Sequence, residues 1–248
     1  TLTGFIHDEI ACAGLSRAVI GLSGGIDSAL STFLTVQALG PEQVLCVMMP
    51  YRSSNPQSLA HAQLVVDQLG VCSETVDITP MVDPMIDTDP DMDAIRRGNI
   101  MARQRMIVLY DRSSRDGALV VGTGNRTENL LGYTTLYGDS ACAINPLGNL
   151  YKTQVRQLSR HLGVPEVIIE KAPSADLWTG QTDESELGFT YEDADRLLHC
   201  MIDLQYDETQ LAADGFDPDL VTAVRSMVER NAFKRRLPLV PSLPDTRN

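Results

Sequence analysis

A short glycine-rich string constrains this chain more than any other feature. Residues 18–22 are typical of a buried strand and residues 29–34 of a helix, so residues 23–28 form the turn between them. Glycines at such a turn let backbone N–H groups converge on an anion, and the following helix start adds partial positive charge. The common phosphate-binding loop has a Lys in this region, where this chain has Asp27. Because a divalent cation can bridge a carboxylate and a phosphate, we expect Asp27 to hold Mg²⁺ of a bound nucleotide.

Strand and helix patterns alternate along the chain, which favours a parallel sheet with helices on both faces. A further helix is expected to carry Ile100, Ile107 and Val108 on one stripe. We predict an α/β fold with a doubly wound, Rossmann-like parallel sheet of five strands in the order 3-2-1-4-5. The whole length, residues 1–248, is expected to form one synthetase-sized domain with no glutamine amidase domain. The strand patterns cover residues 17–22, 43–49, 71–78 and 118–121, and the clearest helical patterns cover residues 5–14, 56–69 and 152–162.

A second glycine turn follows the fourth strand pattern, at residues 122–125. In the expected strand order the first and fourth strands are neighbours, so both turns open onto the crevice where ligands bind in such sheets. Glu128 lies one helical turn further on and would face Asp27 across this crevice. Two carboxylates are a usual protein contribution to a Mg²⁺ site, the remaining ligands being phosphate oxygens and water. Taken singly, each feature is also compatible with an ordinary connecting turn and an ordinary helix cap.

Composition excludes several classes of function. The net charge of −13 is unfavourable for a general nucleic-acid binder. No apolar run approaches the length of a membrane span, about 18 residues. The five scattered cysteines form no paired motif, which favours a reducing, cytoplasmic compartment and gives neither a zinc site nor a disulfide framework.

The first loop resembles the pyrophosphate-binding loop of the N-type ATP pyrophosphatases, which cleave ATP between the α and β phosphates. Further segments resemble ammonia-dependent NAD synthetases, and the resemblance extends from about residue 17 to residue 236. It implies the fold of the adenine nucleotide alpha hydrolases, a homodimer, ATP, deamido-NAD and ammonia as substrates, and Mg²⁺ as cofactor. The loop is Gly21-Leu22-Ser23-Gly24-Gly25-Ile26-Asp27-Ser28, and the further segments are residues 99–105, 122–128, 137–139, 150–156, 171–178, 180–188 and 233–236.

The resemblance also implies roles for individual residues. Asp27 and Glu128 would hold Mg²⁺, and Asp139 would lie near the ammonia site as a general base. Residues 174–187, with Trp178 and Gly180, resemble a loop that closes over the substrates, although Trp178 could equally be an ordinary packed ring. The residues implied to bind ATP are the loop 21–28, Thr123, Lys152 and Ser174, and those implied to contact deamido-NAD are Arg103, Tyr133, Asp139 and Lys234.

Three positions depart from the family pattern where it contacts the dinucleotide, namely Leu136, Ala143 and Phe233. They leave two alternatives open besides an NAD synthetase with repositioned contacts. One is a related amidating ligase that acts on a different carboxylic acid. The other is a regulatory protein that binds ATP without turnover, although two carboxylates and Lys152 around the phosphates favour an enzyme. For the enzyme we expect adenylation of the nicotinate carboxylate by ATP, followed by attack of ammonia.

Overall fold

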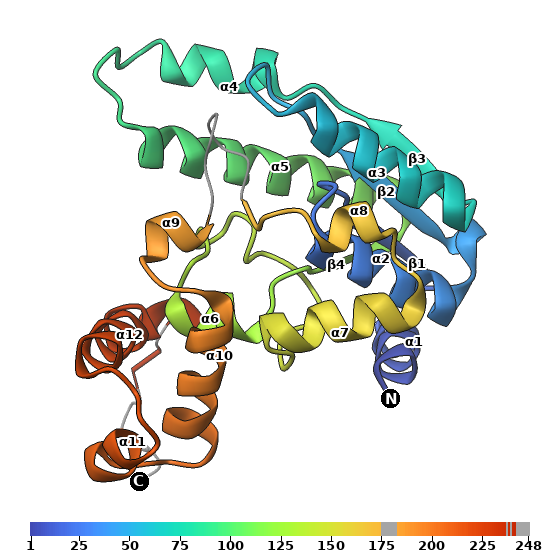
Figure 1. The fold of residues 1–248 in the computed structure, drawn as a ribbon. Helices are drawn as coiled ribbons and strands as arrows, with labels where there is room; N and C mark the ends of the chain where they lie inside the picture. The colour runs from blue at the N-terminus through green and yellow to red at the C-terminus, as the bar shows by residue number, and fades with distance from the viewer. Residues whose placement is uncertain (175–182, 237, 239, 242–248) are drawn as a thin grey trace, which may run out of the picture.

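The sheet of this protein is parallel, and its strands follow the order β3-β2-β1-β4 (Figure 1). The structure, a computed structural model, describes residues 1–174, 183–236, 238, 240 and 241. The central strand β1 pairs with β2 on one side and with β4 on the other. The expected α/β class, the parallel pairing and the order of these four strands are therefore confirmed. The strands are β1 (Arg17–Gly21), β2 (Val44–Met48), β3 (Cys72–Thr75) and β4 (Ala118–Val121).

The expectation of a fifth strand is wrong for the described part of the chain. Beyond β4 there is only an isolated parallel bridge between Val121 and Ile144. Pro146 follows two residues later and has no N–H to donate to a ladder. The side chain of Asn145 instead donates to the carbonyl of Gly124, 2.9 Å away. The segment after β4 thus turns back over the second glycine turn instead of extending the sheet.

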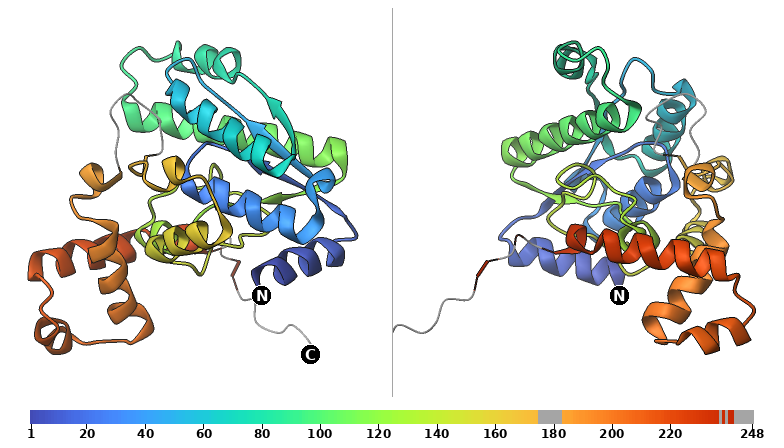
Figure 2. Two further views of the ribbon diagram at one scale, coloured as in Figure 1. Left: turned by 45° about the vertical axis from the view of Figure 1, so that its right-hand side comes forward. Right: turned by 90° about the vertical axis from the view of Figure 1, so that its left-hand side faces the viewer.

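Helices cover both faces of the sheet, as the alternation of side chains along β1 requires (Figures 1 and 2). Ala18 and Ile20 belong to the buried cluster that contains α1, α2 and α7. Val19, between them, belongs to the cluster that contains α4 and α5. Successive residues of a strand face opposite sides, so a strand buried on both sides is apolar throughout. This accounts for the uninterrupted apolar run that precedes the first glycine turn.

The helices begin and end largely where their capping residues predict. In α3, Asn55 accepts a hydrogen bond from the N–H of Gln57 at 2.9 Å, and Gly70 ends the helix in the left-handed conformation. The helices are α1 (Leu2–Cys12), α2 (Ile26–Leu39), η1 (Pro41–Gln43), α3 (Pro56–Leu69), α4 (Thr79–Ile86), α5 (Ala94–Asp116), α6 (Arg126–Leu131), α7 (Lys152–Leu162), α8 (Glu166–Ile169), α9 (Asp183–Leu187), α10 (Tyr191–Leu198), η2 (His199–Asp203), α11 (Glu208–Ala213), α12 (Pro218–Arg230) and η3 (Ala232–Arg235).

The last helices form a group of their own beside α6, at the lower left of Figure 1. Their buried cluster includes Leu197 and Leu198 of α10, Val224 of α12 and Leu131 of α6. This cluster fixes α10 against α6 and α7, which places one face of α10 beneath the end of the sheet where the glycine turns lie. No helix within the described ranges is long and apolar enough to cross a membrane.

One detail of α5 differs from the expectations, and one expected segment is not covered by the described residues. Ile107 of α5 is 53% exposed, so the expected stripe with Ile100 and Val108 is wrong at that position. The buried side of α5 is instead built on small residues and methionine, including Gly98, Met101 and Ala102. The residues Trp178 and Gly180 of the expected closing loop lie outside the described residues.

Candidate active site

Both glycine turns open into one cavity of about 760 Å³ at the carboxyl end of the sheet. The turn after β1 and the turn after β4 contribute to its wall, as do the starts of α2 and α7. The hydroxyl of Ser31 on α2 donates to the carbonyl of Gly122 at 3.0 Å, which ties the helix that follows the first turn to the second turn. Neighbouring parallel strands end at the same edge, so this convergence follows from the strand order.

The first loop is held closed by its own serines. The hydroxyl of Ser28 donates to the carbonyl of Gly25 at 2.9 Å and lies 3.0 Å from the hydroxyl of Ser23. Gly24 has a φ of 76°, and a Cβ added there would lie 2.0 Å from the carbonyl oxygen of Ser58 on α3. Gly25 is the N-cap of α2 and has no side chain to offer the helix start. The first turn of α2 therefore faces the cavity with the partial positive charge that favours an anion.

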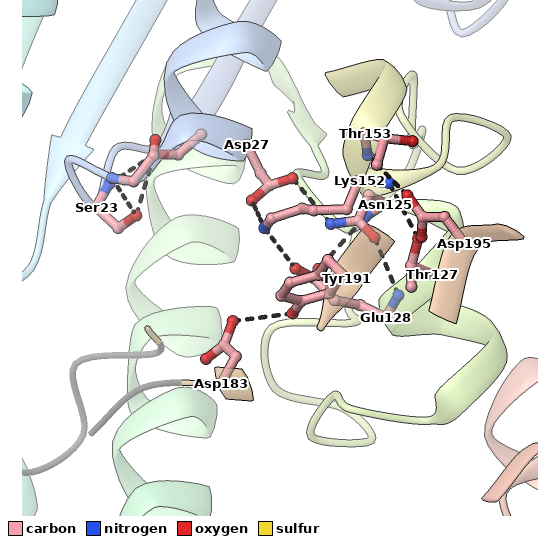
Figure 3. Close-up of polar contacts among 12 residues, drawn as sticks. Ser23, Asp27, Asn125, Thr127, Glu128, Lys152, Thr153, Asp183, Tyr191 and Asp195 are labelled. Atoms are coloured by element: carbon pink, nitrogen blue, oxygen red, sulfur yellow. Dashed lines mark hydrogen bonds and ion pairs between the residues drawn. The ribbon is translucent and has the colours of Figure 1, made fainter. Parts of the chain in front are cut away.

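A cluster of three charged side chains lies beside this loop (Figure 3). The ammonium of Lys152, at the start of α7, is 2.5 Å from Oδ2 of Asp27 and 3.0 Å from Oε1 of Glu128. The residue Lys152 is only 2% exposed. Asn125 donates to Oδ1 of Asp27 at 2.9 Å and accepts from the N–H of Glu128 at 3.0 Å. The ammonium of Lys152 thus joins the carboxylates of Asp27 and Glu128, which are far apart in the sequence, and the amide of Asn125 joins the Asp27 carboxylate to the backbone of Glu128.

Negative charge exceeds positive charge among the side chains of the cluster, and the pKa values of these groups are shifted accordingly. Burial raises the pKa of Glu128 from its ordinary 4.5 to about 7, an effect that the ammonium of Lys152 reduces without cancelling. Burial lowers the pKa of Lys152, but the charges of Asp27 and Glu128 outweigh it and raise this pKa above its ordinary value. Asp183 also lines the cavity, and its pKa is raised by burial. Two carboxylates thus contact one ammonium, and the charge of a third, Asp183, also acts on this cluster.

The donor set fits a divalent cation accompanied by phosphate. Both carboxylates of the pair Asp27 and Glu128 reach one common nitrogen, so both can reach one common ion. Carboxylate oxygens are the ligands that Mg²⁺ uses, and two of them leave positions for phosphate oxygens and water. Within the described residues no group of three or more His, Cys, Asp or Glu side chains is gathered that could hold a metal ion by itself.

Tyr133, Asp139 and Lys234 also line the cavity. Lys234 donates to the carbonyls of Gly132 and Thr134, both at 2.7 Å. The carboxylate of Asp139 accepts from the N–H of Thr135 at 2.7 Å. The Asp139 carboxylate is accessible from the cavity but has protein atoms on its other sides. This limited hydration raises the pKa of Asp139, and the positive charge of Lys234 lowers it by a smaller amount.

Most of the residues singled out from the sequence line this single cavity. Two do not. Gly24 turns towards α3, as its close approach to Ser58 shows, and Arg103 directs its guanidinium at the carbonyl of Leu136, with nitrogen–oxygen distances of 3.2 and 3.3 Å. The lining residues from the predicted set are Gly21, Leu22, Ser23, Gly25, Ile26, Asp27, Ser28, Thr123, Glu128, Tyr133, Asp139, Lys152, Ser174 and Lys234.

Sequence reasoning missed several polar residues around the charge cluster. Asn125 carries a recognisable signal, because Asn followed three residues later by Glu is a capping box, and the structure contains that box. Tyr191 lies with its ring centroid 5.1 Å from the ammonium of Lys152 and donates its hydroxyl to Asp183 at 2.9 Å. Asp195 accepts hydrogen bonds beneath the cluster. Tyr191 and Asp195 belong to a helix more than sixty residues further along the chain than Glu128, and nothing in their local sequence places them here.

Comparison with known proteins gives a consistent result. A family model described as NAD synthase matches residues 1–238. An NH(3)-dependent NAD(+) synthetase of Trichlorobacter lovleyi is 57% identical over 239 residues, which cover 96% of this chain and 88% of that protein. Among solved structures, an NMN synthetase from Francisella tularensis superimposes with a TM-score of 0.87 at 33% identity, covering 98% of this chain and 96% of the other. An NH3-dependent NAD synthetase from Campylobacter jejuni gives a TM-score of 0.82 at 33% identity, covering 97% and 96% of the two chains.

Proposed function

Because this chain belongs to the NAD synthase family, we propose that it is an ammonia-dependent NAD synthetase, a ligase that forms a carbon–nitrogen bond with ATP. The observation that carries the proposal is the cluster of Asp27, Glu128 and Lys152 beside the glycine loop. A protein that only binds ATP has no need for two partly buried carboxylates around a buried cation beside the phosphates. An enzyme that cleaves ATP at its innermost bridge must balance developing negative charge at that place.

We propose that the first loop and α2 hold the phosphates, with Thr123 and Ser174 contacting the rest of the ATP. Asp27 and Glu128 would hold Mg²⁺, which would neutralise phosphate charge when bound. Lys152 has three N–H donors, and Asp27 and Glu128 account for two of them. Its remaining donor capacity is suited to an oxygen of the departing pyrophosphate. Holding these groups in advance lowers the barrier, because no reorganisation is needed as charge develops.

The reaction needs activation because a carboxylate cannot be amidated directly at neutral pH. The nicotinate carboxylate of deamido-NAD attacks the α-phosphate of ATP, the bond from that phosphorus to the bridging oxygen breaks, and pyrophosphate leaves. Ammonia then attacks the acyl carbon, a proton is lost, and AMP departs to leave the amide of NAD. A cavity of about 760 Å³, lined both by the charge cluster and by Tyr133, Asp139 and Lys234, suits two substrates lying side by side.

We assign Asp139 as the group that accepts the proton of the attacking ammonia. Asp139 lines the cavity, and restricted hydration raises the pKa of its carboxylate above the ordinary value, which makes it a better proton acceptor. The substitution Asp139→Asn should slow the ammonia step while acyl-adenylate formation, measured as pyrophosphate release, persists. Equal loss of both steps would contradict this role.

The acid substrate is tested by comparing two chemically related acids in separate assays, because the chain also resembles an NMN synthetase. Purified protein is incubated with ATP, Mg²⁺ and ammonium together with either deamido-NAD or nicotinate mononucleotide, and AMP and the amide product are measured. We expect the dinucleotide to give the higher kcat/KM. AMP formation that depends only on the mononucleotide, or on another acid, would overturn the proposed substrate. Tight ATP binding without AMP formation would overturn the proposed activity.

We further propose that the protein acts as a cytoplasmic homodimer. All five cysteines are free thiols, which supports a reducing compartment. The exposed face of α5 carries Ile107, 53% exposed, and Tyr110, 38% exposed, three residues apart. Apolar side chains exposed along one helix face are typical of a subunit contact. Sedimentation of the wild-type protein and of Ile107→Glu tests this proposal, and an unchanged mass for the variant would exclude this face as the contact.

A further inference from the structure

One face of α10 lies directly beneath the charge cluster (Figure 3). Tyr191 and Asp195 are four residues apart on this helix and therefore share a face. Tyr191 places its ring under the ammonium of Lys152, 5.1 Å away. Asp195 contacts the polypeptide on either side of the same cluster. Helix α10 thus contacts the ammonium of Lys152 through Tyr191 and the backbone next to Lys152 through Asp195.

Asp195 is a buried carboxylate, 5% exposed, with both oxygens engaged. Its Oδ1 accepts from the hydroxyl of Thr127 at 2.5 Å, and its Oδ2 accepts from the N–H of Thr153 at 2.7 Å. Thr127 lies in the first turn of α6 and Thr153 in the first turn of α7. A single carboxylate therefore joins the starts of the two helices that supply the charge cluster.

Thr127 completes the link between these two helices. Its hydroxyl oxygen also accepts the backbone N–H of Lys152 at 3.0 Å, while its proton goes to Asp195. Thr127 is 0% exposed, so water cannot replace either partner. The two residues that Asp195 holds, Thr127 and Thr153, are the immediate chain neighbours of Glu128 and Lys152. A change in the Asp195 contacts is therefore transmitted to the cluster through a single peptide unit on each side.

We propose that Asp195 is a positioning residue of the synthetase reaction, which sets the distance of Lys152 from Glu128 and Asp27 through Thr127 and the start of α7. This inference rests on the proposed function, since it assigns the residue to the same reaction. Asp195 touches no substrate itself. Its carboxylate also complements the partial positive charge at the start of α7, so the charge as well as the geometry of the group matters.

A purely structural role predicts a different outcome from a positioning role. A capping carboxylate that only stabilises α7 would lower the melting temperature and leave the turnover of the folded enzyme unchanged. A positioning carboxylate would lower kcat, because the cluster acts on the departing pyrophosphate, and would change the KM for ATP much less. Groups that orient the ligands of a metal-and-phosphate site change activity about 10- to 100-fold when removed.

The experiment uses four single variants of the full chain and the double variant Asp195→Asn/Thr127→Val, all assayed for NAD formation below their melting temperatures. Asp195→Asn keeps the shape but replaces one acceptor by a donor, and Thr127→Val keeps the shape but removes the hydroxyl. Thr127→Ser restores the hydroxyl and serves as the conservative rescue. Asp207→Asn is the matched control, since Asp207 caps α11 by accepting from the N–H of Gln210 at 2.9 Å, and Figure 1 shows α11 at the lower left, away from α6 and α7, which supply Glu128 and Lys152.

We expect Asp195→Asn and Thr127→Val each to lower kcat by about 10- to 100-fold with a KM for ATP within about threefold of wild type, and Thr127→Ser to regain most of the loss. The double variant should lose little more than the worse single variant, because both changes break one network. A wild-type kcat in Asp195→Asn, or losses in the two variants that simply multiply, would overturn the positioning role. Failure of the proposed function itself is distinguishable, because the wild-type protein would then form no NAD.

Discussion

Replacing the carboxylate of Glu128 by an amide separates stability from activity at the charge cluster. Glu128→Gln keeps the size of the side chain and keeps an oxygen that can accept the N–H of Asn125 in the capping box. It removes one negative charge from a site where burial raises the pKa of Glu128 from 4.5 to about 7. The native protein therefore holds this proton more tightly than the unfolded chain does.

The sign and size of the effect follow from linkage. Between pH 4.5 and about pH 7 the folded state binds more protons at Glu128 than the unfolded state, so this residue makes stability fall as the pH rises. At about 1.4 kcal/mol per pH unit, the contribution is about 3 kcal/mol. It is absent below pH 4.5 and complete above about pH 7. Glu128→Gln should accordingly be more stable than wild type by up to about 3 kcal/mol at pH 8, and the advantage should disappear at pH 4.5.

Urea unfolding at a series of pH values, without nucleotide or divalent cation, measures this difference directly. The control is Glu166→Gln, because Glu166 is largely exposed, with 57% of its side chain accessible, and its removal should leave the pH dependence unchanged. Glu128→Gln should also lower NAD-forming activity by about two to three orders of magnitude, since it removes a charge that the reaction requires. A wild-type slope of stability against pH in Glu128→Gln would refute the assignment of a buried, destabilised carboxylate.

Two further predictions concern the first glycine loop and Lys234, one of the residues implied to contact deamido-NAD. Gly24→Ala should lower the free energy of unfolding by about 1–3 kcal/mol and abolish activity, because a φ of 76° and a carbonyl oxygen 2.0 Å from the new Cβ force the loop to move. Thermal melting and NAD formation test this prediction. A fully active variant would contradict it. Lys234→Met should raise the KM for deamido-NAD about 10-fold or more and change the KM for ATP less, because it removes a charged donor from the cavity lining. Steady-state kinetics with each substrate varied provide the test. Equal changes in both KM values would argue against the assignment.

Local sequence was sufficient for the elements that carry the site. The apolar run, the glycine turn and the following helix start are determined by neighbours in the chain, and the structure has β1, the loop and α2 at those positions. The strand order could be anticipated because parallel strands joined by helices allow few arrangements. That order alone brings Asp27 and Glu128 to the same edge of the sheet. The number of strands could not be anticipated, because Ile144 forms a bridge whose continuation depends on the contacts of Asn145.

The tertiary structure alone decided what surrounds the cluster. Asp195 and Tyr191 lie on a helix whose own pattern is that of an ordinary amphipathic helix, and only the packing of α10 against α6 and α7 brings them under Lys152. Likewise the family resemblance implies a substrate contact for Arg103, and only the folded structure shows that its guanidinium is directed at the carbonyl of Leu136. The sequence by itself determined which residues could bind phosphate and metal, because glycine conformations and carboxylate chemistry are local properties. The protonation, orientation and supporting contacts of those residues depend on burial and on distant segments, which exist only after the chain has folded.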